Sequence, residues 1–236
     1  MAIFHFHVEN IKRSKGNSIV DIAARRSAST LLDQHLGKVF NYKGKSEIVY
    51  SRVLLPVNVP REFLDRSFLW NKIECKEKRK DSQLAKQIGV SLPKELSIEQ
   101  QTTLLEQFVV SQFTEIGMMA DVNIMKRSED NFYGYILLTM RLYNVNGFGN
   151  KIREWGNKDL LHQWRKAWAC SVNENLQQAG FGHIQVDHRS YADQGLDKGQ
   201  QPLPHIGKAA FNAAKRGDKL DRWLDYEKMK ATSDQK

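Results

Sequence analysis

The stretch Ala120–Arg141, ADVNIMKRSEDNFYGYILLTMR, decides the fold that we predict for this chain. Its first part, Ala120–Met125, alternates in polarity and runs into a polar turn at Lys126–Asn131. A β-branched, aromatic and apolar run, Tyr133–Met140, follows directly. Two strand-like runs separated by a short polar turn are typical of a β-hairpin.

The hairpin places three side chains close together. Side chains two residues apart on a strand share a face, so Tyr133 and Tyr135 are expected to point the same way. Met125 ends the first strand and is expected to lie across the hairpin, within reach of both rings. This face of the hairpin is therefore the first place to look for function.

The remaining pattern predicts an α+β chain. Outside the hairpin, the strand-like runs are Ile3–Val8, Glu47–Pro56, Gln87–Leu92 and His183–His188. Helical runs are Ile19 to about Leu36, Arg61–Lys86 after Pro60, Ile98–Ile116, Lys158–Ala179 and Ala209 to about Lys230. A Gly/Asn loop is expected at Asn144–Asn150. Neither an internal repeat nor a second domain is evident.

Composition limits the class of protein. The 236 residues are 41% hydrophobic and include five Trp, which is enough for one large folded domain. The net charge of +9 favours a polyanionic partner, with nucleic acid as the first candidate. The two cysteines, Cys75 and Cys170, form no metal-binding motif and fit a reducing, cytoplasmic location. The sequence shows neither a signal peptide nor an apolar run long enough to span a membrane.

Several blocks of the sequence resemble the MobA/MobL relaxases, the plasmid-mobilisation members of the HUH endonucleases. The matching blocks, in chain order, are SKGNSIVDIAARRSAS (14–29), LWNKIECKEKRKDSQLA (69–85), the hairpin 120–141 and VDHRSYADQGLD (186–197). The resemblance covers roughly Met1–Arg216. It implies a palm of about five mainly antiparallel strands, helices packed on one face and a DNA cleft on the other. We expect one relaxase-like domain over 1–216 and a basic C-terminal helix and tail over 217–236.

The catalytic positions of the family are substituted here. The resemblance places the nucleophilic tyrosine of the family at Arg25, directly before Arg26-Ser27. It places two carboxylates near the active site at Gln87 and Gly89. An arginine cannot form the phosphotyrosyl link through which a relaxase cleaves DNA, although it binds phosphate well. We therefore expect no catalytic residue at these positions.

The metal positions are substituted as well. In the family three histidines hold a divalent metal such as Mg²⁺ or Mn²⁺, and the resemblance places them at Met125, Tyr133 and Tyr135. Thioether and phenol groups are poor ligands for a hard divalent ion, so no metal cofactor is expected. His5 and His7 share a strand face, but no third ligand stands at a definite spacing. Packing or hydrogen bonding is the favoured explanation for this pair.

Three functions remain open. The first is a relaxase-like protein that binds plasmid or mobile-element DNA, in single-stranded form, without nicking it, as part of conjugative mobilisation or its regulation. Its DNA-binding residues would be Lys12, Arg13, Lys15, Arg25, Arg26, Tyr133 and Tyr135. The second is an active relaxase with an unusual tyrosine and metal arrangement. The third is a protein-interaction module, and mobilisation or secretion-apparatus proteins are candidate partners.

Overall fold

The computed structural model describes residues 4–44, 47–190, 193–195, 213–214, 216–218, 221 and 223–227. The chain forms two compact units, Met1–His188 and Arg189–Lys236. The first unit contains every helix and strand discussed below. In the described part of the chain, no helix combines the length and apolarity needed to cross a membrane. The predicted C-terminal helix, Ala209–Lys230, falls largely outside the described residues, and the predicted division at 216/217 stays a prediction.

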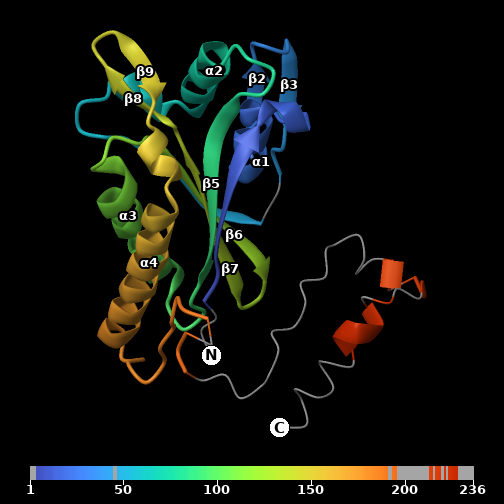
Figure 1. Cartoon of the computed structure of the whole chain (residues 1–236), viewed down its shortest axis with the longest axis vertical. Helices are drawn as coiled ribbons and strands as arrows, with labels where there is room; N and C mark the ends of the chain where they lie inside the picture. The colour runs from blue at the N-terminus through green and yellow to red at the C-terminus, as the bar shows by residue number, and fades with distance from the viewer. Residues whose placement is uncertain are drawn as a thin grey trace. The chain divides into compact units, whose positions relative to one another are not determined.

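A five-stranded sheet forms the centre of the first unit (Figure 1). Its strands, in spatial order, are β1 (Phe6–Lys12), β5 (Gln83–Leu92), β7 (Asn131–Leu138), β6 (Ala120–Ser128) and β4 (Ile48–Leu54). Every neighbouring pair is antiparallel. The predicted α+β class with about five antiparallel strands is confirmed, and β6 and β7 form the predicted hairpin.

Helices α3 (Ile98–Val109) and α4 (Lys158–Gln178) cover one face of the sheet (Figure 1). Ser97 caps α3 in a reciprocal capping box with Gln100. The helix then continues as one π-helical segment, Val110–Thr114. Its core with the sheet includes the fully buried rings of Trp164 and Trp168.

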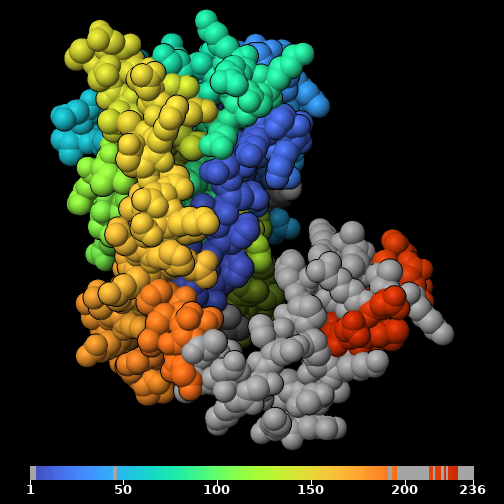
Figure 2. All heavy atoms as spheres, viewed as in Figure 1, coloured from blue at the N-terminus to red at the C-terminus, as the bar shows by residue number. Residues whose placement is uncertain are grey.

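The opposite face is covered over part of its length only. Helices α1 (Ile19–Arg26) and α2 (Arg66–Lys76), with the small hairpin β2 (Thr30–Asp33) and β3 (Lys38–Asn41), pack where β1 ends and β5 begins. Ile11, Ala85 and Leu137 supply the apolar sheet surface beneath them. The rest of this face carries Tyr133 and Tyr135. In Figure 2 the blue residues of β1 and α1 form a strip of the surface beside yellow α4.

Two predicted helices are wrong at their C-terminal ends. The first was expected to reach Leu36, but α1 ends at Arg26 and the chain turns at Ala28, whose φ is 51°. The carboxylate of Asp33 then accepts the backbone N–H groups of the following turn and fixes the β2–β3 hairpin. The second was expected to reach Lys86. Instead α2 ends at Lys76, because the next ten-residue strand is paired and buried on both sides.

Two further predictions need correction. The expected loop Asn144–Asn150 is a hairpin, β8 (Arg141–Asn144) and β9 (Gly147–Lys151). Its turn is closed by the Asn144 side chain, which accepts the Asn146 N–H at 2.9 Å, and by Gly147 at a φ of 90°. The expected strand His183–His188 is not a strand. The Asn173 amide of α4 takes the place of a neighbouring strand by bonding both the N–H and the carbonyl of Val186.

Short 3-10 helices complete the first unit. They are η1 (Arg13–Lys15), η2 (Arg61–Leu64) and η4 (Arg153–Gly156).

Candidate functional site

The uncovered part of the sheet brings the predicted site residues of the hairpin together. Met125 of β6 pairs directly with Tyr133 of β7, as the alternation predicts. The Tyr133 and Tyr135 rings lie 4.9 Å apart between centroids, on the same face. Both tyrosines are nearly buried, with 7% and 8% of their surfaces exposed. What covers these rings therefore decides what the site can bind.

Two guanidinium groups lie on the two rings. The Arg26 guanidinium carbon lies 3.6 Å from the centroid of the Tyr135 ring. The Arg127 guanidinium carbon lies 3.9 Å from the centroid of the Tyr133 ring, and Arg127 Nη2 donates a hydrogen bond to the Tyr135 hydroxyl. A guanidinium over an aromatic face is attracted by the ring quadrupole, by about 0.5–2 kcal/mol depending on its exposure. The result is a compact cluster of alternating cations and rings, which we call the Arg–Tyr cluster (Arg26, Arg127, Tyr133 and Tyr135).

Gln87 links this cluster to β1. Its side-chain oxygen accepts a hydrogen bond from Arg26 Nε at 3.0 Å, and its amide nitrogen donates to Glu9 Oε1 at 2.7 Å. Gln87 therefore orients the Arg26 guanidinium without neutralising it, whereas a carboxylate at this position would have done both. Among the described residues, Arg26 forms no ion pair. Burial lowers its pKa below the ordinary value, which is the effect expected for a cation that is partly desolvated.

Gly89 makes room for Tyr133. A Cβ at Gly89 would lie 2.8 Å from both the hydroxyl and a ring carbon of Tyr133, which is closer than real contacts allow. The absence of a side chain at this position is therefore a steric requirement of the Tyr133 ring. Burial is the main cause that raises the pKa of Tyr133 to about 12, so its phenol is neutral at physiological pH.

A polar cavity of about 320 Å³ opens beside the cluster. Its polar lining includes Glu9, Lys15, Asn17, Arg25, Arg26 and Gln87. Arg25 projects from α1 and is exposed, while Lys15 comes from the turn between β1 and α1. The cavity thus combines three cationic side chains with one carboxylate, and a negatively charged group would be attracted to it.

The other predicted DNA-binding residues lie elsewhere. Arg13 points into the protein, where its guanidinium bonds the Glu74 carboxylate at 2.5 Å and a backbone carbonyl of the same residue at 3.1 Å. Lys12 is half-buried at the end of β1. The structure thus brings Lys15, Arg25 and Arg26 together and separates Arg13 from them.

Arg127 was missed by the sequence analysis. We assigned it to the turn, because the first strand was expected to end at Met125. In the structure β6 continues to Ser128, with an irregular register after Lys126. The signal was present in the sequence, since Asn123, Met125 and Arg127 alternate on one face in the same way as Tyr133 and Tyr135.

The residues at which the family resemblance places metal ligands, Met125, Tyr133 and Tyr135, do not fit a divalent ion. They offer one thioether and two phenols, and Tyr133 stays protonated far above neutral pH. Both rings also lie against a guanidinium, so a divalent cation would meet two positive charges at close range.

His5 and His7 do not supply an alternative metal site. Their rings are 6.4 Å apart and stacked, and the His5 ring lies 5.5 Å from that of Tyr133. Within the described ranges, no group of three or more His, Cys, Asp or Glu side chains is placed to share a metal ion. This pair instead extends the aromatic surface of the Arg–Tyr cluster along β1.

Comparison with curated proteins gives consistent names. The chain is 29% identical to a "Probable conjugal transfer protein TraA" of Sinorhizobium fredii over 97% of its own length and 23% of that protein. It is 28% identical to "Mobilization protein MobL" of Acidithiobacillus ferridurans over 97% of its length and 68% of that protein. The chain spans less than a quarter of the length of the TraA relatives that it matches.

Solved structures give the same answer for the fold. A structure described as "Molecular Basis of Vancomycin Resistance Transfer in Staphylococcus aureus" shares 33% identity and a TM-score of 0.76, over 80% of this chain and 100% of that one. The metal-free conjugative relaxase TrwC in complex with OriT DNA shares 11% identity and a TM-score of 0.50, which indicates a shared fold alone. The family model described as the MobA/MobL family matches residues 17–216, and this chain therefore belongs to the MobA/MobL family.

Proposed function

We propose that this protein binds single-stranded DNA in conjugative mobilisation, or in its regulation, without nicking the strand. The observation that carries the proposal is the Arg–Tyr cluster, in which two guanidinium groups lie on Tyr133 and Tyr135, the rings at which the family resemblance places metal ligands. The same cluster opens onto a cavity that is lined by Lys15, Arg25 and Arg26. The protein would act in the cytoplasm, and mobilisation or secretion-apparatus proteins are proposed as further partners.

The charge of the site supports a polyanionic ligand. Arg25, Arg26 and Arg127 form no ion pair with any described residue, so their charge is available to a phosphate. Guanidinium groups bind phosphate through two parallel hydrogen bonds, which makes them stronger phosphate ligands than lysine. Membership of a mobilisation family and the net charge of +9 point to the same class of ligand.

The arrangement of the rings supports a single strand over a duplex. Bases of a single strand are free to stack on aromatic rings or on guanidinium planes, with about 1–3 kcal/mol per base. The His5 and Tyr133 rings lie next to each other at the edge of the cluster, and His5 is exposed. We propose that backbone phosphates contact Lys12, Lys15, Arg25 and Arg26 while bases reach His5, Arg127 and the edges of both tyrosines. Arg13 is left out because its donors are used within the protein.

The chemistry of the site supports binding without cleavage. Arg25 occupies the position of the tyrosine nucleophile of the family, and a guanidinium forms no phosphodiester link with DNA. Tyr133 is a poor replacement, because its pKa of about 12 and its burial keep the hydroxyl protonated and covered. An active relaxase with an unusual arrangement is therefore the less favoured hypothesis.

A protein-interaction module is the second candidate. The near-complete burial of Tyr133 and Tyr135 favours it, since a filled site has less room for a ligand. The adjacent open cavity with its unpaired arginines favours nucleic acid more strongly.

Fluorescence anisotropy with a labelled single-stranded oligonucleotide tests the proposal. Measurements at two salt concentrations, with Mn²⁺ and with EDTA, are combined with a denaturing gel of the same samples. We expect salt-sensitive binding that is equal with and without metal, and an intact strand on the gel. Arg25→Ala should reduce the slope of log affinity against log salt by about 0.7. Arg61→Ala is the control, because it removes an exposed arginine that is distant in sequence from Arg25, and it should leave the slope unchanged.

Two results would refute the proposal. A covalent protein–DNA band would make the enzyme hypothesis primary. Absence of binding at low salt would favour the protein-interaction module.

A further inference from the structure

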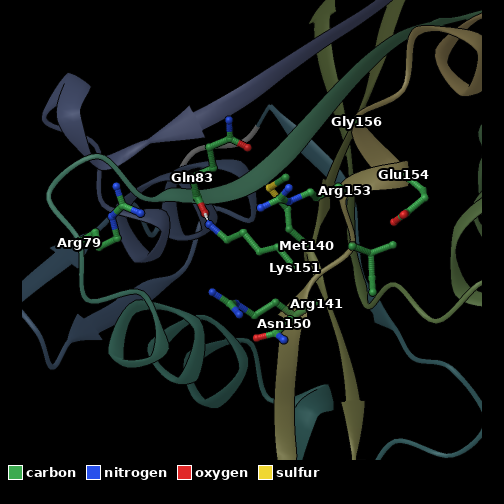
Figure 3. A pocket seen from close by; sticks show the side chains of 10 residues that line it. Arg79, Gln83, Met140, Arg141, Asn150, Lys151, Arg153, Glu154 and Gly156 are labelled. Carbon is green, nitrogen blue, oxygen red and sulfur yellow. Dashed lines mark hydrogen bonds between the residues drawn. The ribbon is translucent and has the colours of Figure 1, made fainter.

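A second cavity of the first unit lies away from the Arg–Tyr cluster. It measures about 810 Å³ and opens where β5 starts, beyond the end of β7, against the β8–β9 hairpin and η4 (Figure 3). Met140, on its wall, follows Tyr135 by five residues and lies two residues beyond the end of β7, which corresponds to about 16 Å along an extended chain. The two sites are therefore separate.

Cationic side chains from three segments line this cavity. Arg79 comes from the loop before β5, Arg141 and Lys151 come from the β8–β9 hairpin, and Arg153 begins η4. In Figure 3 Arg79, Arg141, Lys151 and Arg153 gather around the same space, whereas Glu154 lies on the side opposite Arg79. Convergence of cations from distant parts of the chain requires a compensating interaction, because like charges repel.

A buried carboxylate supplies that interaction. The Glu77 carboxylate accepts a hydrogen bond from Arg141 Nε at 2.7 Å and forms an ion pair with Lys151 Nζ at 3.0 Å. Lys151 Nζ also donates to the Gln83 carbonyl at 2.5 Å, and Arg141 donates to the Gly149 carbonyl at 2.7 Å. Burial acts to raise the pKa of Glu77, but these hydrogen bonds outweigh it and lower the pKa below its ordinary value. Glu77 thus holds the charged groups of Arg141 and Lys151 in fixed positions.

Two of the cations that line the cavity are not held by a buried carboxylate of the described chain. Arg153 is exposed and forms no ion pair with a described residue. Among the residues that the structure describes, Arg79 forms an ion pair with Asp81 alone, and this pair is weak because both side chains are largely exposed. One wall is apolar, through Met140 and Ile152, and the Gln83 and Asn150 side chains line the space between.

We infer that this cavity binds a phosphorylated nucleotide, either free or as one unit of a nucleic-acid strand. Its volume lies within the range of about 300–1,000 Å³ that is usual for small-ligand sites. The phosphate would lie on Arg153 and Arg79, where charge-assisted bidentate hydrogen bonds are available. The base would lie on Met140, whose thioether makes favourable contacts with aromatic rings, and the Gln83 and Asn150 amides would meet its edge.

Isothermal titration calorimetry at low salt tests whether the cavity binds a free nucleotide. The probes are thymidine 5′-monophosphate, inorganic phosphate and thymidine. We expect the monophosphate to bind at least ten times more tightly than either fragment. Arg153→Ala should weaken its binding about tenfold, as expected for the loss of a hydrogen-bonded charge pair. Arg61→Ala is a close control, because Arg61 is also an exposed first residue of a four-residue 3-10 helix. It should change the affinity less than twofold.

A labelled oligothymidylate of about 20 nucleotides tests whether the cavity binds one unit of a nucleic-acid strand. If the monophosphate does not bind, a roughly tenfold loss of oligonucleotide affinity in Arg153→Ala and Arg79→Ala, but not in Arg61→Ala, would still support the site. Both variants alter exposed side chains, so the fold should persist. The inference fails if phosphate binds as tightly as the monophosphate, if Arg61→Ala matches Arg153→Ala, or if neither probe responds to the cavity variants. These outcomes are independent of Arg25→Ala, which reports on the proposed function alone.

Discussion

The Tyr133 hydroxyl occupies the space that a side chain on Gly89 would need, since an ideal Cβ on Gly89 would come within 2.8 Å of it. Gly89 pairs directly with Tyr135 of β7, and Tyr133 is its diagonal neighbour on the same face, two residues along the strand. The family resemblance places a carboxylate at Gly89 and a histidine at Tyr133. In this structure the ring at one position excludes a side chain at the other, so these two departures from the family pattern depend on each other.

Substitution of Gly89 tests this dependence. Gly89→Ala should destabilise the protein by about 1–3 kcal/mol, because the ring must move out of a packed position. In the Tyr133→Ala background the same substitution should cost much less, because the space is then free. Urea unfolding of the four proteins in this double-mutant cycle measures the coupling.

Gly156→Ala is the control for this cycle. A Cβ at Gly156 meets no atom within 4 Å, and its backbone conformation accepts alanine. The free energy of unfolding should change by no more than about 0.5 kcal/mol. If Gly89→Ala and Gly156→Ala behaved alike, the steric relationship between Gly89 and Tyr133 would be wrong.

The sheet and its central hairpin were predictable from the sequence, but several boundaries were not. Alternation along Ala120–Met125, the polar turn and the β-branched, aromatic and apolar run Tyr133–Met140 identified both strands, although both faces of each are largely buried. The sequence predicts helix for the N-terminal part of β5, because the helical spacing of the residues before it runs on without a turn signal and this part shows no alternation of its own. Asn173 shows a different limit: its amide replaces the strand that we expected at His183–His188, and no local pattern encodes such a contact.

The residues of the proposed site come from motif positions in the sequence, but their contacts were not predictable. Motif positions located Arg25, Tyr133 and Tyr135, and strand alternation predicted that the two rings lie together. Stacking of Arg26 on Tyr135 depends on how α1 packs against the sheet, which is a tertiary relationship. For the same reason, the sequence could not show that Arg13 turns towards Glu74 while Arg26 turns towards the rings.

Histidines introduced at the three positions where the family resemblance places metal ligands should not by themselves create a tight metal site. We expect the triple variant Met125→His, Tyr133→His, Tyr135→His to bind Mn²⁺ weakly, because Arg26 and Arg127 would still face the site. Adding Arg26→Gln and Arg127→Ala should tighten Mn²⁺ binding on the order of tenfold or more by removing two nearby charges. Titration calorimetry with Mn²⁺ measures both affinities.

Arg61→Ala on the triple background is the matched control for charge. It removes a distant cation and should leave the Mn²⁺ affinity within twofold. Equal affinity of the triple and quintuple variants would show that the guanidinium groups do not hinder a metal at this site.

The raised pKa of Tyr133 predicts how stability depends on alkaline pH. Burial raises the pKa from 10.0 to about 12, so the folded state holds the phenolic proton more tightly than the unfolded state. This contribution to stability is complete below pH 10 and is lost as the pH rises to about 12. Urea unfolding of the wild type and Tyr133→Phe at pH 9, 10 and 11 compares the two slopes.

We expect a shallower decline for Tyr133→Phe than for the wild type. Part of the decline should remain in the variant, because the pKa of Tyr50 is also raised to about 12, by burial and by its hydrogen bond to Glu106. Parallel declines in the two proteins would mean that Tyr133 titrates near its ordinary pKa and is less buried than the structure shows.

Asp121 should be among the most sensitive positions for stability in the first unit. Its fully buried carboxylate accepts hydrogen bonds from three side chains, those of Arg66, Trp70 and Asn123. Asn123 pairs across the strands with Tyr135, so this network also holds β6 in place beneath the Arg–Tyr cluster. Asp121→Asn keeps the shape but leaves the Arg66 guanidinium without a counter-charge in a mostly buried position. We expect a loss of about 3–5 kcal/mol, which is typical when one partner of a buried ion pair is removed.

Asp81→Asn is the control, because it breaks an ion pair of the same chemistry in an exposed position. The Arg79–Asp81 distance is 3.2 Å, but the side chains are 82% and 67% exposed, and such pairs contribute about 0–1 kcal/mol. Urea unfolding should therefore separate the two variants by at least about 2 kcal/mol. A difference below that would indicate that water reaches Arg66 after the substitution. In that case the position of β6, and with it the register of Tyr135, would depend on the backbone ladder with β7 and not on Asp121.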